Sequence, residues 1–146
     1  MLSQAVKDEL KNIVGEGRYF DNPEDLLLYS YDAFMVQGLP EAALLPVHTE
    51  EVSRIMKVAF RERIPVTARG AGTNLAGGSV PTRGGIALVF TKMNKILEIS
   101  KENRIAVVHP GMHIKRISQS LPSSPRRSGW LVRRAETMCR RFPAGG

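Results

Sequence analysis

Residues 64–81 read IPVTARGAGTNLAGGSVP, and this stretch decides the fold that we expect for the chain. It begins as a short run rich in β-branched residues, which predicts a strand at 64–68. It then breaks into a loop that carries four glycines, a threonine and an asparagine. Such a loop either joins two elements or brings its backbone close to a ligand, and composition alone does not separate the two.

The residues before the loop predict a βαβ unit. EAALLPV at 41–47 is typical of a buried strand, and Thr49 is typical of a helix cap because Glu50-Glu51 follows it. Along the helix, five apolar residues form one core-facing stripe, namely Val52, Ile55, Met56, Ala59 and Phe60. The two strands should run parallel, and the loop then leaves the carboxyl end of the second, where ligands of α/β sheets tend to bind.

Further elements are predicted on both sides of this unit. They are a helix at 3–14 that stops at Gly15, a short helix after the capping pair Asn22-Pro23, and strands at 86–90, 96–100 and 105–108. The KENR turn at 101–104 makes the last two strands an antiparallel hairpin. In the strand at 96–100, alternation puts Leu97 and Ile99 on one face and Glu98 on the other.

The loop differs from two familiar nucleotide-binding loops. A Rossmann fingerprint needs a third glycine where Leu75 stands and a helix after it. A P-loop needs Gly-Lys-Ser or Gly-Lys-Thr, whereas Gly77 is followed by Gly78-Ser79-Val80. Without a helix dipole, an anion would have to be held by successive backbone N–H groups curled into a nest.

The loop contains residue types that suit such a nest. Glycines permit positive φ and leave no Cβ in the way of a phosphate oxygen, and they stand at Gly70, Gly72, Gly77 and Gly78. Thr73 and Asn74 can add side-chain donors. Arg69 could supply charge, although an arginine beside a loop is more often part of a surface ion pair. A pyrophosphate is the ligand that this set suits.

The charge of the chain is uneven along its 146 residues, which sum to +7. Residues 122–146 hold six arginines in three adjacent pairs against one acid, Glu136. Residues 1–121 hold the other 15 basic and 13 acidic residues, so that part is close to neutral. It has no basic stripe with interleaved aromatic residues. Nucleic acid is therefore not an expected partner, and such a role would rest on the tail alone.

Other classes of protein are disfavoured by further features. No run approaches the roughly 18 apolar residues of a membrane-spanning helix, and Asp8 and Glu9 do not fit a secretory signal, so we expect a cytoplasmic protein. A single cysteine, Cys139, excludes an internal disulfide. His109 and His113 are separated by Pro110-Gly111, which breaks the helix that would pair them. We expect no metal and identify no catalytic residue.

Two strings carry a resemblance to a known family. They are LLPVHTEEVSRIMKVAFRERIPVTARGAGTNLAGG, and IALVFTKMNKILEIS followed by RIAVVHPGM. Residues 41–112 thereby resemble the N-terminal half of the FAD-binding domain of the vanillyl-alcohol oxidase and p-cresol methylhydroxylase (PCMH) type, above all in the FAD-linked subunit of glycolate oxidase and in D-lactate dehydrogenases. The resemblance implies an α+β fold, with a helical segment at 1–40, a partial PCMH-type domain at 41–121 and a basic, irregular tail at 122–146.

The resemblance also implies a cofactor, FAD, and the residues that hold it. They are Arg69, Gly70, Ala71, Gly72, Thr73 and Asn74 under the pyrophosphate, Gly77 and Gly78 closing around it, and Pro110 and Gly111 passing near it. The implied substrate is a 2-hydroxy acid such as glycolate or D-lactate, and a full-length relative would have an electron-transfer subunit as partner. YSYDA at 29–33 is implied to be a packing and access segment.

Residues from about 122 onward depart from the family. Relatives continue into a glycine-rich GGN stretch and a separate substrate domain, whereas this chain gives PSSPRRSGWLVRRAETMCRRFPAGG without convincing strand alternation. Our hypothesis is a shifted reading frame or a truncated product. The alternatives are a natural disordered basic tail, or a tail that binds nucleic acid or anionic lipid.

Two functions follow from these predictions. The first is the FAD-binding part of a 2-hydroxy-acid oxidoreductase, with weak or no FAD binding and no turnover by residues 1–146 alone. The second is a non-catalytic remnant or binding module that keeps the nest.

Overall fold

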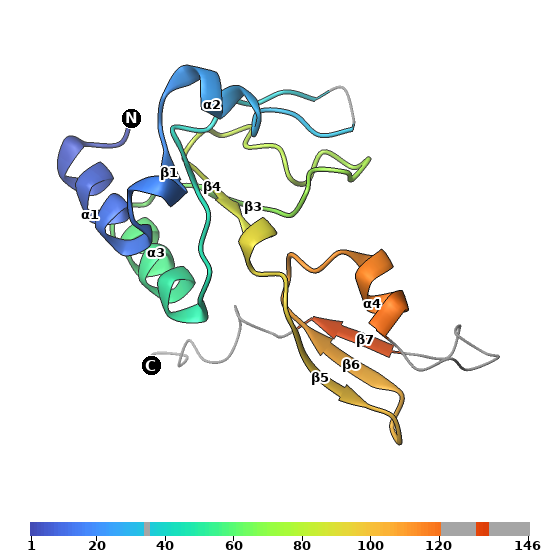
Figure 1. The fold of residues 1–146 in the computed structure, drawn as a ribbon. Coiled ribbons are helices and arrows are strands. Elements are labelled where there is room, and N and C mark those ends of the chain that lie inside the picture. The colour runs from blue at the N-terminus through green and yellow to red at the C-terminus, as the bar shows by residue number, and fades with distance from the viewer. Residues whose placement is uncertain (34–35, 121–130, 135–146) are drawn as a thin grey trace, which may run out of the picture. The chain divides into compact units, whose positions relative to one another are not determined.

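The computed structural model describes residues 1–33, 36–120 and 131–134. The chain divides into two compact units, Met1–Lys92 and Met93–Gly146. Each unit has its own sheet, and Figure 1 shows both. The first unit contains the glycine-rich loop, so its architecture determines where a ligand can bind.

The first unit is a four-stranded sheet with helices. Its elements are α1 (Gln4–Val14), a 3₁₀ turn at Glu16–Arg18, β1 (Tyr19–Phe20), α2 (Pro23–Leu27), β2 (Ala42–Leu44), α3 (Thr49–Arg61), β3 (Val66–Arg69), β4 (Ile86–Val89) and a 3₁₀ turn at Phe90–Lys92. The strand order is β1-β2-β4-β3, in which β2, β4 and β3 are parallel and β1 is antiparallel to β2. The predicted parallel orientation of the βαβ strands is confirmed, but β4 lies between them.

This strand order makes the glycine-rich loop a crossover connection. Val66 pairs with Ile86 and Arg69 with Val89, so the chain must return from the end of β3 to the start of β4. Parallel neighbours are usually joined through a helix, yet residues 70–85 contain only turns and bends. The loop therefore spans the length of the sheet with irregular backbone.

Gly85 closes this crossover where three strands meet. Its carbonyl accepts hydrogen bonds from the N–H groups of Glu41 and Ala42, at 2.7 and 3.3 Å, at the start of β2. The next residue, Ile86, donates its N–H to the carbonyl of Pro65 at 2.9 Å, just before β3. Main-chain hydrogen bonds thus fix Gly85 between the two neighbouring strands.

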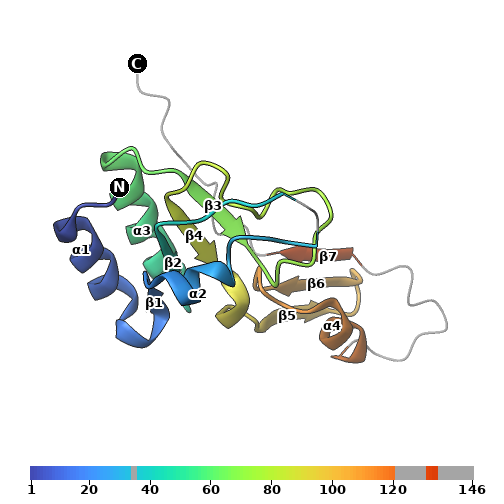
Figure 2. The ribbon, with the colours of Figure 1, turned by 90° about the horizontal axis from the view of Figure 1, so that it is seen from above.

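Apolar side chains are buried on both faces of the sheet. Leu26 of α2 packs with Ala43, Leu45, Ala87 and Val89, and Phe20 and Tyr29 lie at the edge of this cluster. Alternation turns Ala42, Leu44, Ile86 and Leu88 to the other face, where all four are fully buried. Helices α1 and α3 contact each other and lie side by side against the sheet (Figures 1 and 2). Strands buried on both faces are typical of parallel sheets.

The helix ends follow the predicted caps in two of three cases. Gly15 ends α1 at φ +85°, and the Asn22 side chain accepts from the N–H of Asp25 at 2.8 Å. The Ser3 hydroxyl caps α1, a contact that was not predicted. The prediction that Thr49 caps α3 is wrong, because α3 begins at Thr49 and His48 is the capping residue without a side-chain bond. The Glu51 carboxylate instead accepts the N–H of Val47 at 2.7 Å.

Glu51 also connects α3 to the turn before β1. Its carboxylate accepts a hydrogen bond from Arg18 at 2.7 Å, and its side chain is only 13% exposed. Burial alone raises the pKa of Glu51, but hydrogen bonds from Arg18 and from backbone N–H groups outweigh burial and lower the pKa below its ordinary 4.5. A lowered folded-state pKa adds stability above the unfolded-state value, and that stability is lost as pH falls through the folded-state value.

We therefore expect Glu51→Gln to lower the free energy of unfolding at neutral pH by about 1–3 kcal/mol, since bonds to a charged acceptor are lost. The difference from the unchanged protein should shrink as pH falls below about 4.5. Denaturant unfolding at several pH values measures both effects. The matched control is Glu50→Gln, because Glu50 is exposed on the same helical turn. Equal losses for the two variants, or a difference independent of pH, would contradict this role of Glu51.

The buried face of α3 differs from the predicted stripe. Val52, Ile55 and Ala59 are buried as predicted, but Val58 joins them, and Phe60 is 76% exposed. Met56 is half-buried. The face that packs on the sheet is thus rotated toward Val58, and the prediction of Phe60 as a core residue is wrong.

The second unit is a three-stranded sheet with one helix. Its elements are β5 (Ile96–Ser100), β6 (Ile105–Val108), α4 (Ile114–Ser120) and β7 (Leu131–Arg134). The predicted antiparallel hairpin of β5 and β6 is confirmed, and β7 pairs parallel to β6. Strand β7 lies within the tail, where the sequence has no convincing strand alternation.

A bulge in β5 overturns the predicted alternation of that strand. Ile96 pairs with Val108 and Glu98 with Val107, so Leu97 is an extra residue. As a result Ile96 and Ile99 pack on the core of Ala106, Val108, Met112 and Ile117. Leu97 is 51% exposed, so the prediction that Leu97 and Ile99 share a face is wrong.

Candidate functional site

The glycine-rich loop lies at the carboxyl end of β3, next to the chain that follows α2. Figures 1 and 2 both show these two segments running side by side. All predicted site residues from Arg69 to Gly78 belong to the first unit. The loop and residues 28–33 therefore form one candidate site within that unit.

The glycines of the loop serve two different purposes. Gly72 and Gly77 have φ of +73° and +70°, a region that favours glycine. Gly70 and Gly78 lie outside that region, and a Cβ at either would meet no atom within 4 Å. Gly72 and Gly77 thus let the backbone turn, whereas Gly70 and Gly78 leave open space beside it.

The backbone N–H groups of the first half of the loop are available. Among the hydrogen bonds of the described residues, none is donated by the N–H of Ala71, Gly72 or Thr73. Ala71 and Thr73 are exposed, and Gly72 is half-buried. Successive backbone N–H groups are what an anion-binding nest is made of, and here three of them lie beside open space.

Arg69 is a buried residue beneath the loop. Its side chain is 7% exposed, and its guanidinium donates to the carbonyl of Tyr31 at 2.5 Å and to that of Leu28 at 3.3 Å. A Cβ at Gly72 would collide with this guanidinium. The alternative of a surface ion pair does not fit a guanidinium held by two backbone carbonyls.

Asn74 is held by two buried polar side chains. Its amide donates to a carboxylate oxygen of Asp32 at 2.6 Å, and its amide oxygen accepts from the hydroxyl of Ser79 at 2.5 Å. Asp32 and Ser79 are each 7% exposed. We call this hydrogen-bonded set of Asp32, Asn74 and Ser79 the amide latch, because the Asn74 amide joins Asp32 to Ser79.

Asp32 and Ser79 do not stand out in the sequence as site residues. Asp32 lies within YSYDA at 29–33, and Ser79 directly follows the second glycine pair. An acid inside a segment otherwise rich in apolar and aromatic residues is the only signal that points to Asp32. The partner of that acid lies 42 positions away, so spacing could not have revealed the contact.

Pro110 and Gly111 lie in the second unit, in the turn between β6 and α4. Gly111 donates its N–H to the carbonyl of Met93, and Met112 donates to that of His109, at 2.9 and 3.1 Å. Both predicted residues are half-buried. Their role beside a cofactor stays a prediction.

The histidines take part in local backbone contacts. The Nδ1 atoms of His109 and His113 accept from the N–H groups of Lys95 and Lys115, at 3.4 and 3.3 Å. Within residues 1–33, 36–120 and 131–134, no three His, Cys, Asp or Glu side chains are grouped to hold a metal ion. In the same part of the chain, no helix is both long and apolar enough to cross a bilayer. Cys139 lies outside the described residues.

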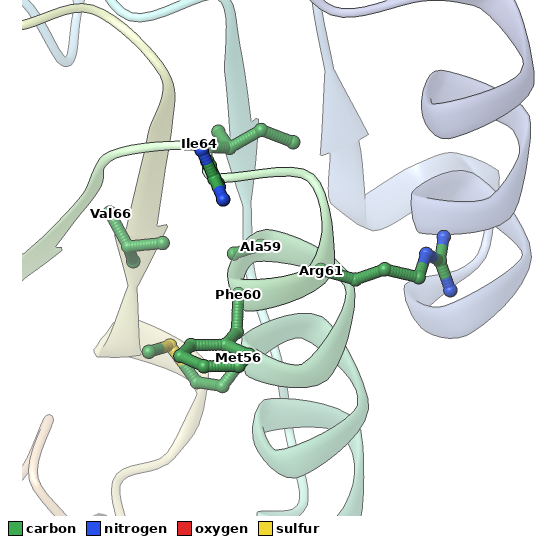
Figure 3. A pocket seen from close by; sticks show the side chains of 7 residues that line it. Met56, Ala59, Phe60, Arg61, Ile64 and Val66 are labelled. Carbon is green, nitrogen blue, oxygen red and sulfur yellow. The ribbon is translucent and has the colours of Figure 1, made fainter.

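A separate apolar groove lies at the other end of β3. Figure 3 shows it at the C-terminal end of α3, lined by Met56, Ala59, Phe60, Arg61, Arg63, Ile64 and Val66. Arg61 is paired with Glu9 and Glu62, at 2.6 and 2.7 Å. Because Val66 begins β3 and Arg69 ends it, this groove is not part of the candidate site.

Known proteins match most of the chain in sequence. A family model described as an FAD binding domain matches residues 40–130. The chain is 43% identical over 113 residues to glycolate oxidase subunit GlcD of Bacillus subtilis, covering 77% of this chain and 24% of that protein. It is 44% identical over 97 residues to D-lactate dehydrogenase of Archaeoglobus fulgidus, covering 63% of this chain and 22% of that protein.

Solved structures match the fold. p-Cresol methylhydroxylase with substrate bound aligns with a TM-score of 0.72 at 24% identity, over 81% of this chain and 25% of that one. The 4-ethylphenol oxidase from Gulosibacter chungangensis aligns with a TM-score of 0.69 at 28% identity, over 79% and 23%. The chain spans about a quarter of the length of the relatives that it matches.

Proposed function

Because the chain belongs to the family of FAD-binding domains, we propose that its loop at residues 69–78 holds the pyrophosphate of FAD on backbone amides. The observation that carries the proposal is the row of three N–H groups at Ala71, Gly72 and Thr73, which donate to no acceptor among the described residues. The open space at Gly70 and Gly78 lets phosphate oxygens approach that row. The site therefore fits the group.

Each residue of the loop has a role in this proposal. Ala71, Gly72 and Thr73 donate backbone N–H groups, and the exposed Thr73 adds a hydroxyl. Arg69 and Asn74 support the loop from beneath, and Gly77 and Gly78 close it. A contact of Pro110 and Gly111 with FAD stays a separate prediction. When bound, FAD supplies the acceptor for a hydride, and the protein contributes binding and orientation.

The substrate class that we propose for the whole protein is a 2-hydroxy acid such as glycolate or D-lactate. It is supported by relatives named glycolate oxidase subunit GlcD and D-lactate dehydrogenase. We also propose an electron-transfer subunit as a partner of the whole protein, and the relative from Bacillus subtilis is itself named as one subunit of an oxidase. We propose no catalytic residue among residues 1–146, and we expect this chain alone to bind FAD weakly and to turn over neither acid.

A binding module without catalysis is the second candidate function. Such a module would use the same row of backbone N–H groups at Ala71, Gly72 and Thr73 and would need no catalytic residue. Dye reduction with glycolate or D-lactate separates the two candidates, because only the first predicts that the whole protein oxidises either acid.

Ligand competition tests the proposed pyrophosphate site. We expect FAD and ADP to compete for the purified chain in equilibrium dialysis, and riboflavin, which has no phosphate, to compete with neither. Gly70→Val should weaken FAD binding by about tenfold or more, which is about 1.4 kcal/mol, because its side chain fills the open space beside the amides.

Gly17→Val is the matched control. A Cβ at Gly17 would also meet no atom within 4 Å, and Gly17 has no positive φ, but it lies in the turn at Glu16–Arg18. Absence of FAD binding at millimolar FAD, equal effects of the two valines, or competition by riboflavin would contradict the proposed site.

A further inference from the structure

Residues 28–33 and the glycine-rich loop are joined by side chains from both segments. Arg69 reaches from the start of the loop to the carbonyls of Leu28 and Tyr31. Asp32 reaches from residues 28–33 to the loop, where its carboxylate accepts a hydrogen bond from the side-chain amide of Asn74. The two segments lie about forty positions apart in the sequence, so these contacts determine how they lie against each other.

These contacts are buried, which makes each partner depend on the others. Asp32, Arg69 and Ser79 are each 7% exposed. A buried carboxylate or guanidinium is costly to keep unless its hydrogen bonds are made. Among the described residues, no buried side-chain nitrogen or oxygen lacks a partner. Loss of one member would therefore leave a buried polar group unsatisfied, and the loop would shift to let water reach it.

We propose that Asp32 and Arg69 are positioning residues that hold the loop in the shape that accepts the pyrophosphate, so that flavin binding is coupled to the order of residues 28–33. This inference rests on the proposed function of the loop. It assigns Arg69 a role different from a charged ligand of phosphate, because its guanidinium donates to the backbone carbonyls of Leu28 and Tyr31.

The proposed role makes Lys a poor substitute for Arg69. A lysine keeps the positive charge, but its single ammonium cannot reproduce the planar fork that contacts two carbonyls. If Arg69 bound phosphate through charge, Arg69→Lys would keep much of the affinity for FAD. Because Arg69 is a positioning residue in this proposal, Arg69→Lys should instead lose FAD affinity to a similar extent as Arg69→Gln.

Coupling between two segments is reciprocal. If residues 28–33 shape the flavin loop, then bound FAD must also stabilise residues 28–33. Amide hydrogen exchange in those residues should slow when FAD is added, although the proposed contacts of FAD are all in the loop. A purely structural contact that leaves the loop shape unchanged would not give this response.

Hydrogen exchange of the purified chain without flavin tests the first half of the inference. We expect Asp32→Ala to speed exchange in residues 70–79 by about tenfold to a hundredfold, since a buried charged bond is lost. Asp32→Asn keeps an acceptor for the Asn74 amide and should stay close to the unchanged protein. The matched control is Asp8→Ala, which removes a carboxylate that also accepts from an amide, that of Gln4 at 2.9 Å, but on the surface of α1.

Equilibrium dialysis with FAD tests the second half. Asp32→Ala and Arg69→Lys should each lower FAD affinity by about tenfold or more, with Asp32→Asn restoring most of it. Thermal unfolding shows whether the variants remain folded. If Asp32→Ala does not fold, Ser79→Ala replaces it, because it removes only the hydroxyl contact at the other end of the amide latch.

The outcomes separate this inference from the proposed function. Unchanged loop exchange in Asp32→Ala, or faster exchange with undiminished FAD affinity, would overturn the inference. Arg69→Lys with near-normal affinity would overturn the positioning role of Arg69. If the unchanged chain binds no FAD, the proposed function fails, and the coupling to flavin fails with it, while the exchange data still decide whether the amide latch shapes the loop.

Discussion

Replacement of Gly85 by alanine is expected to unfold the first unit, whereas the same replacement at Gly84 is expected to leave it folded. Both glycines have left-handed φ, +69° at Gly84 and +70° at Gly85, so the conformational strain of an alanine is about the same. A Cβ at Gly85 would overlap the backbone carbonyl oxygen of Pro65 and lie 3.0 Å from the carbonyl carbon. At Gly84, the nearest atom is Glu41 Oε1 at 3.7 Å, an ordinary contact.

The overlap at Gly85 cannot be relieved locally. The Pro65 carbonyl is fixed by the N–H of Ile86, and the Gly85 carbonyl is fixed by those of Glu41 and Ala42. Movement of either would separate β4 from a neighbour. We expect Gly84→Ala to cost about 1–2 kcal/mol for its backbone conformation, and Gly85→Ala to cost more than about 4 kcal/mol.

Urea unfolding followed by circular dichroism measures both changes. The comparison between neighbours isolates the steric contact, since the chemical change and the φ strain are shared. Similar midpoints for Gly84→Ala and Gly85→Ala would show that the approach of Gly85 to Pro65 does not limit the fold.

The second large effect is expected at Gly72, on flavin binding rather than on folding. Gly72→Ala adds strain at φ +73° and places a Cβ against the buried guanidinium of Arg69. Arg69 is a flexible side chain and can move, but only by giving up its bonds to Leu28 and Tyr31. We expect a loss of FAD affinity of about a hundredfold, or roughly 2.7 kcal/mol.

Gly77→Ala is the matched variant for Gly72→Ala. Gly77 has φ +70°, and its Cβ would lie 3.8 Å from Val36 Cγ2, which is an ordinary contact. A smaller loss of FAD affinity is expected there. In addition, once Arg69 has been replaced by alanine, Gly72→Ala should cost no more FAD affinity than Gly77→Ala, because the collision with the guanidinium is gone and only the φ strain remains. Additive losses in this double-mutant cycle would contradict that mechanism.

Local sequence signals predicted much of the fold, because caps and periodicity act between near neighbours. Gly15 and Asn22-Pro23 bound the helices as expected. The predicted family, the PCMH-type fold and FAD as the cofactor are confirmed by the family match and the solved structures. The helix ends could be predicted because capping residues contact backbone groups only a few positions away. The family could be predicted because long segments of the sequence resemble those of relatives.

Long-range contacts explain the predictions that failed. The insertion of β4 between β2 and β3 depends on pairing across the sheet, which no local pattern specifies. The bulge at Leu97 changes side-chain direction by one residue, and the rotation of α3 exposes Phe60. In the candidate site, the glycines were visible in the sequence. The direction of the Arg69 side chain and the partner of Asn74 were not, because both depend on residues 28–33.

The hypotheses for the tail remain predictions. Apart from β7 at Leu131–Arg134, residues 121–146 lie outside the described residues. The shifted reading frame, the disordered basic tail and the tail that binds nucleic acid or lipid therefore stand as alternatives. Sequencing of the locus separates the first from the others.

The strand order of the first unit has a consequence for how the protein acquires its cofactor. β4 follows the glycine-rich loop in the chain, yet it must enter the sheet between two strands that are synthesised before it. Pairings of this kind form slowly, because distant parts of the chain must meet first. The loop connects β3 to β4, so both of its ends are held in the sheet only after β4 has paired with its neighbours. If the loop binds FAD as proposed, we therefore expect flavin binding to follow the release of β4 from the ribosome, because until then only one end of the loop is held in the sheet.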